Sequence, residues 1–184
     1  MKVLSFKTET NGFPLWQARS NDEGQPHLVR LAAVLIDDQS DVVESMDVVI
    51  IPDGWDIPQE TTDVHGITPE FAADNGVNEK DAVELFISLV RKAEKVVSSN
   101  KTFNSRIIRI ALKRHADEFH QEAWADNKDN HFCAIKMAKD DLQNKNVNLF
   151  DALAHYTGES IHNNRDSLVN AQAASKVFFA INSK

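Results

Sequence analysis

The densest group of side chains that could bind an anion lies between Lys101 and Arg114, a stretch with no acidic residue. Arg106, Arg109 and Lys113 follow the spacing i, i+3, i+7, which places them on one face of a helix, opposite an apolar face. Cations arranged in this way could contact the phosphates of a single nucleic-acid strand. The pattern is equally typical of the solvated face of an amphipathic helix, so both interpretations stay open.

The other reactive residue types show no pattern of their own. Cys133 is the single cysteine, so it cannot form an internal disulfide, and we expect it to be a small buried hydrophobe. Four histidines have no metal-ligand spacing with acids or cysteine, namely His115, His120, His131 and His155. Trp16 and Trp55 lie in predicted loops near proline, and an exposed one could contact a partner.

Composition limits the class of protein. The chain has 184 residues, and its 20 Lys+Arg against 28 Asp+Glu give a net charge of −8. This balance argues against broad coating of nucleic acid, although a local basic face could bind a strand. The length predicts one domain over 1–184. No apolar run approaches the ~20 residues of a membrane helix, and no signal-peptide core is visible. We therefore expect a cytoplasmic protein with no membrane contact.

The elements that must position these residues are predicted from hydrophobic periodicity. Three strands are expected first, as a meander, at residues 2–6, 28–36 and 42–51. A short strand is expected at 96–97, and helices at 79–95, 105–115, 148–156 and 166–181. Asn78 is the expected N-cap of the first helix. This order predicts an α/β domain on a mixed sheet flanked by helices.

Four stretches, in this order, resemble the DnaQ-like (DEDDh) 3′–5′ exonuclease superfamily over nearly the whole chain. Residues 3–12 (VLSFKTETNG) resemble a strand that ends in Asp-x-Glu followed by Thr-x-Gly. Residues 64–68 (VHGIT) resemble the His-Gly-Ile-Thr loop after the meander. Residues 99–104 (SNKTFN) resemble His-Asn-x-x-Phe-Asp at a helix start, and residues 165–178 resemble the His-x4-Asp motif of the last helix.

The resemblance implies an RNase H-like mixed sheet, with a three-stranded antiparallel meander plus further strands. It also implies a mechanism in which four carboxylates hold two divalent metal ions and a histidine acts as general base. Active relatives would use Mg²⁺ or Mn²⁺ as cofactor.

The side chains at the matched catalytic positions depart from that pattern. Glu9 is retained, but Lys7 and Asn104 stand where the family has Asp, Arg165 replaces the general-base His, and Asn170 replaces the last Asp. The charges of Lys7, Glu9 and Arg165 sum to +1 − 1 + 1 = +1. Neutral amide oxygens do not replace carboxylates as anchors, and two cations repel a metal ion. We expect no metal site, no cofactor and no catalysis here.

Two interpretations of the altered positions are open. Lys7 could pair with Glu9 while Arg165 binds a phosphate. Both cations could instead merely neutralise the charge of a cleft that has lost its catalytic function. Alternatively, Asp166 and His162 could rebuild a one-metal site with Glu9, although His162-x3-Asp166 is one residue shorter than the family spacing. Asp166 is more simply an acid near the N-terminus of a helix.

The resemblance also implies residues that contact nucleic acid. His65 lies in the loop that resembles the one near the terminal nucleotide, and Ile67 or Phe103 could stack on a base. Structural roles in a turn or in the core are the alternative for each of them. The full set of expected contacts is Thr10, His65, Ile67, Asn100, Phe103, Arg106, Arg109 and Lys113.

Three functions are therefore open. The leading one is a non-catalytic exonuclease-like protein that binds single-stranded nucleic-acid ends or nucleotides. The second is a scaffold or regulatory module with a protein partner. The third is a working metal-dependent exonuclease built from Glu9, Asp166 and His162.

Overall fold

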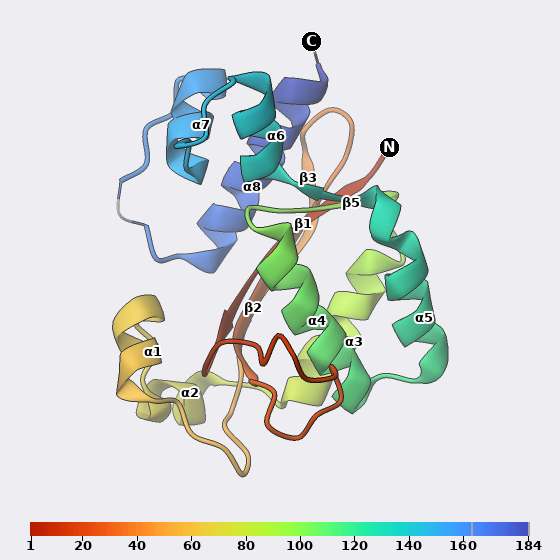
Figure 1. The fold of residues 1–184 in the computed structure, drawn as a ribbon, viewed down its shortest axis with the longest axis vertical. Coiled ribbons are helices and arrows are strands. Elements are labelled where there is room, and N and C mark those ends of the chain that lie inside the picture. The colour runs from red at the N-terminus through yellow and green to blue at the C-terminus, as the bar shows by residue number, and fades with distance from the viewer. Residues whose placement is uncertain (163, 184) are drawn as a thin grey trace.

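The computed structural model describes residues 1–162 and 164–183, which form a five-stranded mixed sheet between two groups of helices (Figure 1). The strand order is β3-β2-β1-β4-β5. The strands are β1 (Val3–Thr10), β2 (Leu28–Ile36), β3 (Val42–Val49), β4 (Lys95–Ser98) and β5 (His131–Cys133). Strands β1, β2 and β3 pair antiparallel, whereas β4 and β5 continue the sheet in parallel. The predicted meander and mixed sheet are confirmed.

Helices cover both faces of this sheet. Along the described residues they are α1 (Gln59–His65), α2 (Pro69–Asn75), α3 (Glu79–Val90), α4 (Lys101–His115), α5 (Glu118–Asp126), α6 (Ala134–Asp141), α7 (Leu149–Thr157) and α8 (Ser167–Asn182), with a 3₁₀ turn, η1 (Asn127–Asn130). Helices α3, α4 and α5 enclose one core with the sheet, and α6, α7 and α8 enclose the other. In the described residues no helix is long and apolar enough to cross a membrane.

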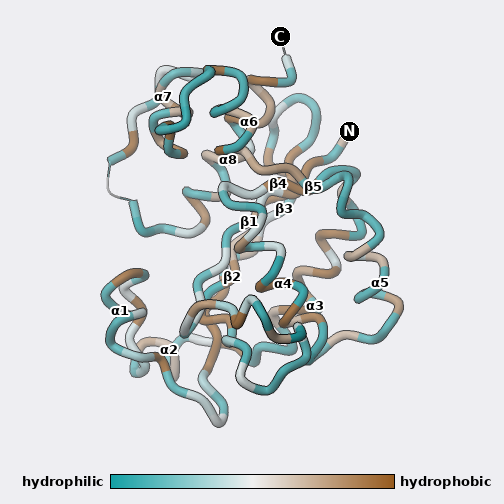
Figure 2. Tube along the Cα trace, in the orientation of Figure 1, coloured by the Kyte–Doolittle hydropathy of each residue, from teal (hydrophilic) through white to brown (hydrophobic). Residues whose placement is uncertain are grey.

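Burial on both faces explains the composition of β2. Every residue of this strand except Arg30 is buried, because helices cover both sides of it. Figure 2 shows hydrophobic segments gathered around the central strands and hydrophilic segments in the outer loops. The edge strand β3 is different, because Val42 and Val43 are exposed there.

Several predicted boundaries were wrong, for identifiable reasons. Strand β1 runs on to Thr10 instead of ending at Phe6, because its polar Lys7 and Glu9 face a cleft while Thr8 and Thr10 are buried. Helix α4 starts at Lys101 instead of 105, since its first turn is polar and Asn100 caps it. Helix α3 ends at Val90, before β4 begins.

The structure also contains elements that the sequence analysis missed, namely α1, α2, α5, α6, η1 and β5. They are short, and α2 and α5 each bury one side chain (Ala72 and Trp124), which is too few to produce a period. The predicted His-Gly-Ile-Thr loop is the junction between α1 and α2. Gly66 has φ +78°, which suits glycine, and Thr68 caps α2 by accepting the Phe71 N–H.

Candidate nucleic-acid cleft

The end of β1 places a cation and an anion side by side. Lys7 and Glu9 lie two residues apart, so they share one face of the strand. The Lys7 Nζ atom lies 2.8 Å from Glu9 Oε1 and donates a hydrogen bond of 2.9 Å to the Thr8 carbonyl oxygen. Both side chains are largely buried, with 21% and 16% of their surfaces exposed. The retained carboxylate is thus neutralised by the lysine that stands at the first Asp position.

A second cation, Arg30 on β2, lies opposite Glu9 in the antiparallel register. Its guanidinium binds both carboxylate oxygens of Asp47, at 2.7 and 2.5 Å. The hydrogen bond to Asp47, with the nearby charges of Asp166 and Glu9, raises the pKa of Arg30. Arg30 was not predicted as a site residue, because its position depends on the strand register.

Asp166 is held by groups of the protein itself. Its Oδ1 accepts the backbone N–H groups of Leu168 and Val169, at 2.8 and 3.0 Å, which caps α8. Its Oδ2 lies 3.6 Å from the Arg30 guanidinium. The next residue, Ser167, donates a hydrogen bond of 3.3 Å to Glu9. These contacts agree with the interpretation of Asp166 as an acid at the N-terminus of a helix.

The amides at the two other altered positions both use their N–H groups. Asn104 is buried, and its Oδ1 accepts from the Thr8 N–H and hydroxyl at 3.0 and 2.8 Å. Its Nδ2 donates to the Asn100 carbonyl oxygen at 2.9 Å. Asn170 Nδ2 donates to the Asp166 carbonyl oxygen at 2.7 Å. A carboxylate at either position would direct an oxygen at a carbonyl oxygen, so the local structure suits amides rather than aspartates.

His65 lies nearby as a buried neutral donor. Its Nδ1 accepts the Ile67 N–H at 3.1 Å, so the ring proton of the neutral form is on Nε2. Burial lowers the pKa of His65, Lys7 lowers it further, and Glu9 opposes both effects. The Nε2 atom is buried and has no hydrogen-bond partner among the described residues. An unsatisfied buried donor is costly, and a ligand oxygen would satisfy it.

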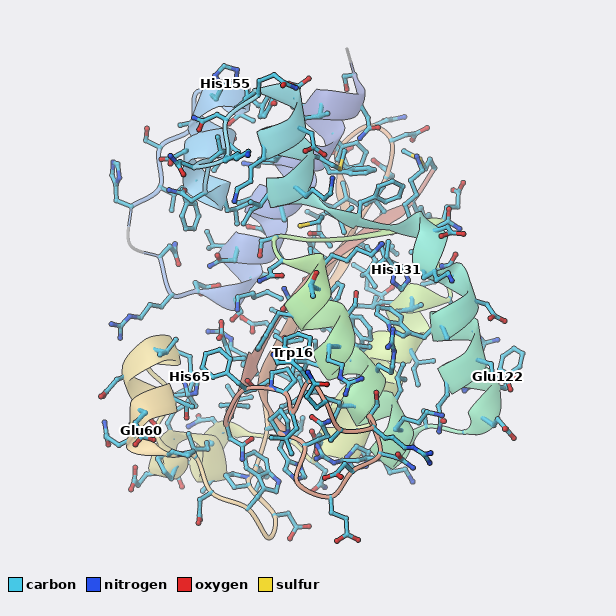
Figure 3. All side chains as sticks on the ribbon, viewed as in Figure 1. Trp16, Glu60, His65, Glu122, His131 and His155 are labelled. Atoms are coloured by element: carbon cyan, nitrogen blue, oxygen red, sulfur yellow. The ribbon has the colours of Figure 1, made fainter. Side chains whose placement is uncertain are left out.

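A pocket of about 310 Å³ adjoins these groups. Glu9 and His65 line it together with the apolar side chains of Phe13, Val64 and Phe103. Phe13 meets Phe103 edge to face, with ring centroids 6.4 Å apart. Figure 3 shows His65 and Glu60, both from α1, on one side of this region. The pocket combines two carboxylates, those of Glu9 and Glu60, with a histidine and aromatic walls.

A larger hollow of about 1040 Å³ lies beside the start of α8. Arg165, His162 and Asn170 line it, and Arg165 and His162 are exposed to solvent. Arg165 forms no ion pair with any of the residues that the structure describes. It is therefore an exposed cation beside this hollow, which shares no lining residue with the Glu9 pocket.

The predicted basic track on α4 is not continuous. Arg106 donates to Ser20 Oγ and to the Ala18 carbonyl oxygen, at 2.9 and 2.6 Å, and so holds a loop. Lys113 donates to Gln121 Oε1 at 2.6 Å. Arg109 is exposed. The helical face exists, but intramolecular contacts occupy two of its three cations.

Other predicted contacts have structural roles. Ile67 is buried in a small core with Val29 and Ile57, so it is not available to stack on a base. Thr10 donates to the Gly12 carbonyl oxygen at 2.7 Å, and Asn100 caps α4 through the Phe103 N–H. The expectation that Cys133 is buried was wrong. Its thiol is half-buried, donates to the Ser99 carbonyl oxygen and lines a hollow.

The side chains of the cleft do not suit divalent metal ions. In the described part of the chain, no group of three or more His, Cys, Asp or Glu side chains could hold a metal ion. The surroundings of Glu9 give the reason, because the nearest charged groups are cations. The residues present do not fit the two-metal centre that the family resemblance implies.

The fold and the cleft define an exonuclease-like domain of the RNase H-like class. The model of the family described as Exonuclease (RNase_T) matches residues 8–178. The chain therefore belongs to this exonuclease family.

Solved structures share the fold at low identity. Exonuclease I of E. coli in complex with a dT13 oligonucleotide matches with a TM-score of 0.73 and 20% identity, over 100% of this chain and 41% of that one. Exonuclease I from Methylocaldum szegediense matches with a TM-score of 0.71 and 17% identity, over 100% and 40%. The chain thus spans about two fifths of the length of these proteins. No curated protein sequence matches it.

Proposed function

We propose that this protein is a non-catalytic member of the exonuclease family that binds the end of a single-stranded nucleic acid, or a nucleotide, in the cleft at Glu9. One observation carries the proposal. The Lys7 ammonium lies 2.8 Å from Glu9, where it neutralises the one retained catalytic carboxylate.

Electrostatics supports binding without metal. Hard divalent cations need several anionic oxygens. Lys7 and Arg165 are instead positively charged, like the metal ions themselves. The same two cations attract a phosphate, and Arg165 can grip it with two parallel N–H donors. In this role the cations of the chain itself replace the metal ions as partners of the phosphate.

The pocket supports a nucleotide as the ligand. His65 lines this pocket, and its Nε2–H, buried and without a partner in the described structure, would donate to a sugar or base oxygen once the ring turns toward the pocket. Phe13 and Phe103 offer aromatic surface for a base. The bound dT13 in the E. coli neighbour makes single-stranded DNA the first probe to use.

Fluorescence anisotropy with a labelled thymidine oligonucleotide tests the proposal. We expect affinity that is the same in EDTA and in Mg²⁺, that falls with salt, and that drops several-fold in Lys7→Met. Lys92→Met is a matched control, because Lys92 also pairs with a glutamate, at 2.6 Å, but on the surface beside β3.

A cleavage assay on the same oligonucleotide with Mg²⁺ and Mn²⁺ provides the second half of the test. We expect no shortening. Metal-dependent shortening that Glu9→Gln abolishes would overturn the non-catalytic assignment, and absence of binding at low salt would overturn the binding assignment.

A further inference from the structure

The loop between β1 and β2 exposes three large apolar side chains within four positions. Phe13, Leu15 and Trp16 are 84%, 46% and 52% exposed. A contiguous exposed apolar patch on a globular domain is typical of a binding surface. Figure 3 shows Trp16 where this loop passes α4, to which Arg106 ties the loop.

The backbone that carries this patch is fixed from within by Gln25. This side chain is buried, and its Oε1 accepts the Leu15 N–H at 3.0 Å. Its Nε2 donates to the carbonyl oxygens of Leu15 and Arg19, each at 3.0 Å. Both ends of the amide are thus used to hold Leu15, directly before Trp16.

Two arginines of α4 hold the same loop from outside. Arg106 donates to Ser20 and Ala18. Arg114 donates to the carbonyl oxygens of Gln25 and Pro26, the latter at 2.6 Å. A loop ordered before binding loses little further conformational entropy when a ligand arrives. Hydrogen bonds of this kind hold the backbone of the loop, so its apolar side chains stay at the surface instead of packing onto the core.

Position and charge identify the ligand that fits. Phe13 lines the Glu9 pocket, so the exposed patch continues directly from the cleft. Arg19, three residues after Trp16 in the same loop, is exposed, on a chain whose net charge is −8. The loop also carries acids, and Asp22 lies beside Leu15, since both side chains approach Gly24. Exposed aromatic surface with a cation in the same loop can bind unpaired bases through stacking and a phosphate through the cation.

We propose that residues 13–16 form a stacking platform for the bases of single-stranded nucleic acid that follow the nucleotide held at Glu9. This inference rests on the proposed function and extends it. Trp16 offers its indole face to a base, Phe13 joins the platform to the pocket, and Arg19 contacts a phosphate between bases. The platform would favour unpaired strands, since stacked bases of a duplex do not offer their faces.

The test compares a thymidine oligonucleotide of roughly ten residues with thymidine monophosphate, by anisotropy competition and by calorimetry. In Trp16→Ala we expect the affinity for the oligonucleotide to fall about ten-fold and the affinity for the mononucleotide to stay unchanged. Trp16→Phe should retain most of the affinity. Phe119→Ala is the matched control, because Phe119 is 69% exposed on α5, outside the loop. Unchanged unfolding midpoints check that the variants fold.

The outcomes separate the two proposals. If wild-type protein binds both ligands and Trp16→Ala binds the oligonucleotide equally well, the platform is refuted while the cleft assignment stands; a protein partner would then be the better occupant of the patch. Equal losses for both ligands would place Trp16 in the cleft itself and also overturn the platform. If the wild-type protein binds neither ligand, both proposals fall.

Discussion

Two glutamates of this domain have basic side chains beside them, yet their environments differ. Glu79, at the start of α3, has a side chain that is 7% exposed, and each of its carboxylate oxygens has at least one partner. His27 Nδ1 and His115 Nε2 lie 2.8 and 3.0 Å from its Oε2, and the Leu28 N–H donates to its Oε1 at 2.9 Å. Glu9 instead meets Lys7 at the wall of an open pocket.

The difference separates a structural carboxylate from one in a binding site. Hydrogen bonds from His115, His27 and Leu28 outweigh burial and lower the pKa of Glu79 to about 2. The network joins the end of the β1–β2 loop to α3 and α4, and His27 also stacks on Trp55. Around Glu9, the buried His65 Nε2 has no partner in the described part of the chain. A completed network stabilises the fold, whereas an incomplete one beside a pocket indicates a place for a ligand.

The largest expected effect is on stability, in Glu79→Gln. The amide leaves a histidine nitrogen without an anionic acceptor, and loss of one partner from a buried charged network costs about 3 kcal/mol of unfolding free energy. Urea denaturation at neutral pH measures it. Glu84→Gln is the control, since the Glu84–Lys80 pair is exposed and contributes well under 1 kcal/mol. Equal stability of both variants would contradict the assignment.

The pH dependence sharpens the same comparison. The folded pKa of Glu79, about 2, lies below the ordinary value of 4.5, so its contribution is complete above pH 4.5 and is lost as the pH falls toward 2. The difference in unfolding free energy between wild type and Glu79→Gln should therefore shrink as the pH falls from about 4.5 toward 2. A difference that grows over this acidic range would show that the sign is wrong.

The surroundings of Glu9 and those of Glu79 could be predicted from the sequence to different extents. Lys7 and Glu9 were found because they stand in a contiguous motif at the end of a strand. Arg30 joins them only through the β1–β2 register, which hydrophobic periodicity does not determine. The Glu79 network was missed because its members come from positions 27, 79 and 115, and in sequence Glu79 is an ordinary acid in the first turn of a helix.

The secondary-structure elements also divide into those that the sequence predicts and those that it does not. Long periodic segments such as β2 and α8 were predicted, because each buries a continuous apolar surface. The three residues of β5 and the short helix α1 carry too little pattern, and tertiary contacts determine them. The motifs of the resemblance gave the positions of Asn104 and Asn170, but not that their amides donate to backbone carbonyl oxygens.

The next effect tests those amides. In Asn104→Asp, the buried side chain loses its donor to the Asn100 carbonyl oxygen and brings a charge into the interior. We expect a loss of about 2 kcal/mol in unfolding free energy, although the change restores the residue type of the active family. Thermal and urea unfolding measure it, with the exposed Asn75→Asp on α2 as control. Unchanged stability, or stabilisation by Mg²⁺, would show that this position still accepts a carboxylate.

The smallest expected effect on stability is at Glu9 itself. In Glu9→Gln, Lys7 loses its ion pair but keeps the hydrogen bond to the Thr8 carbonyl oxygen. Because both side chains are largely buried, we expect a cost of about 1 to 2 kcal/mol, more than for a surface pair. The freed ammonium should bind phosphate more strongly, and affinity for a single-stranded oligonucleotide should rise several-fold at low salt. A glutamate that held a catalytic metal ion would give the opposite result, with weaker binding in Mg²⁺ after its removal. The two carboxylates thus predict opposite outcomes for the same substitution, since loss of Glu79 weakens the fold whereas loss of Glu9 strengthens the binding.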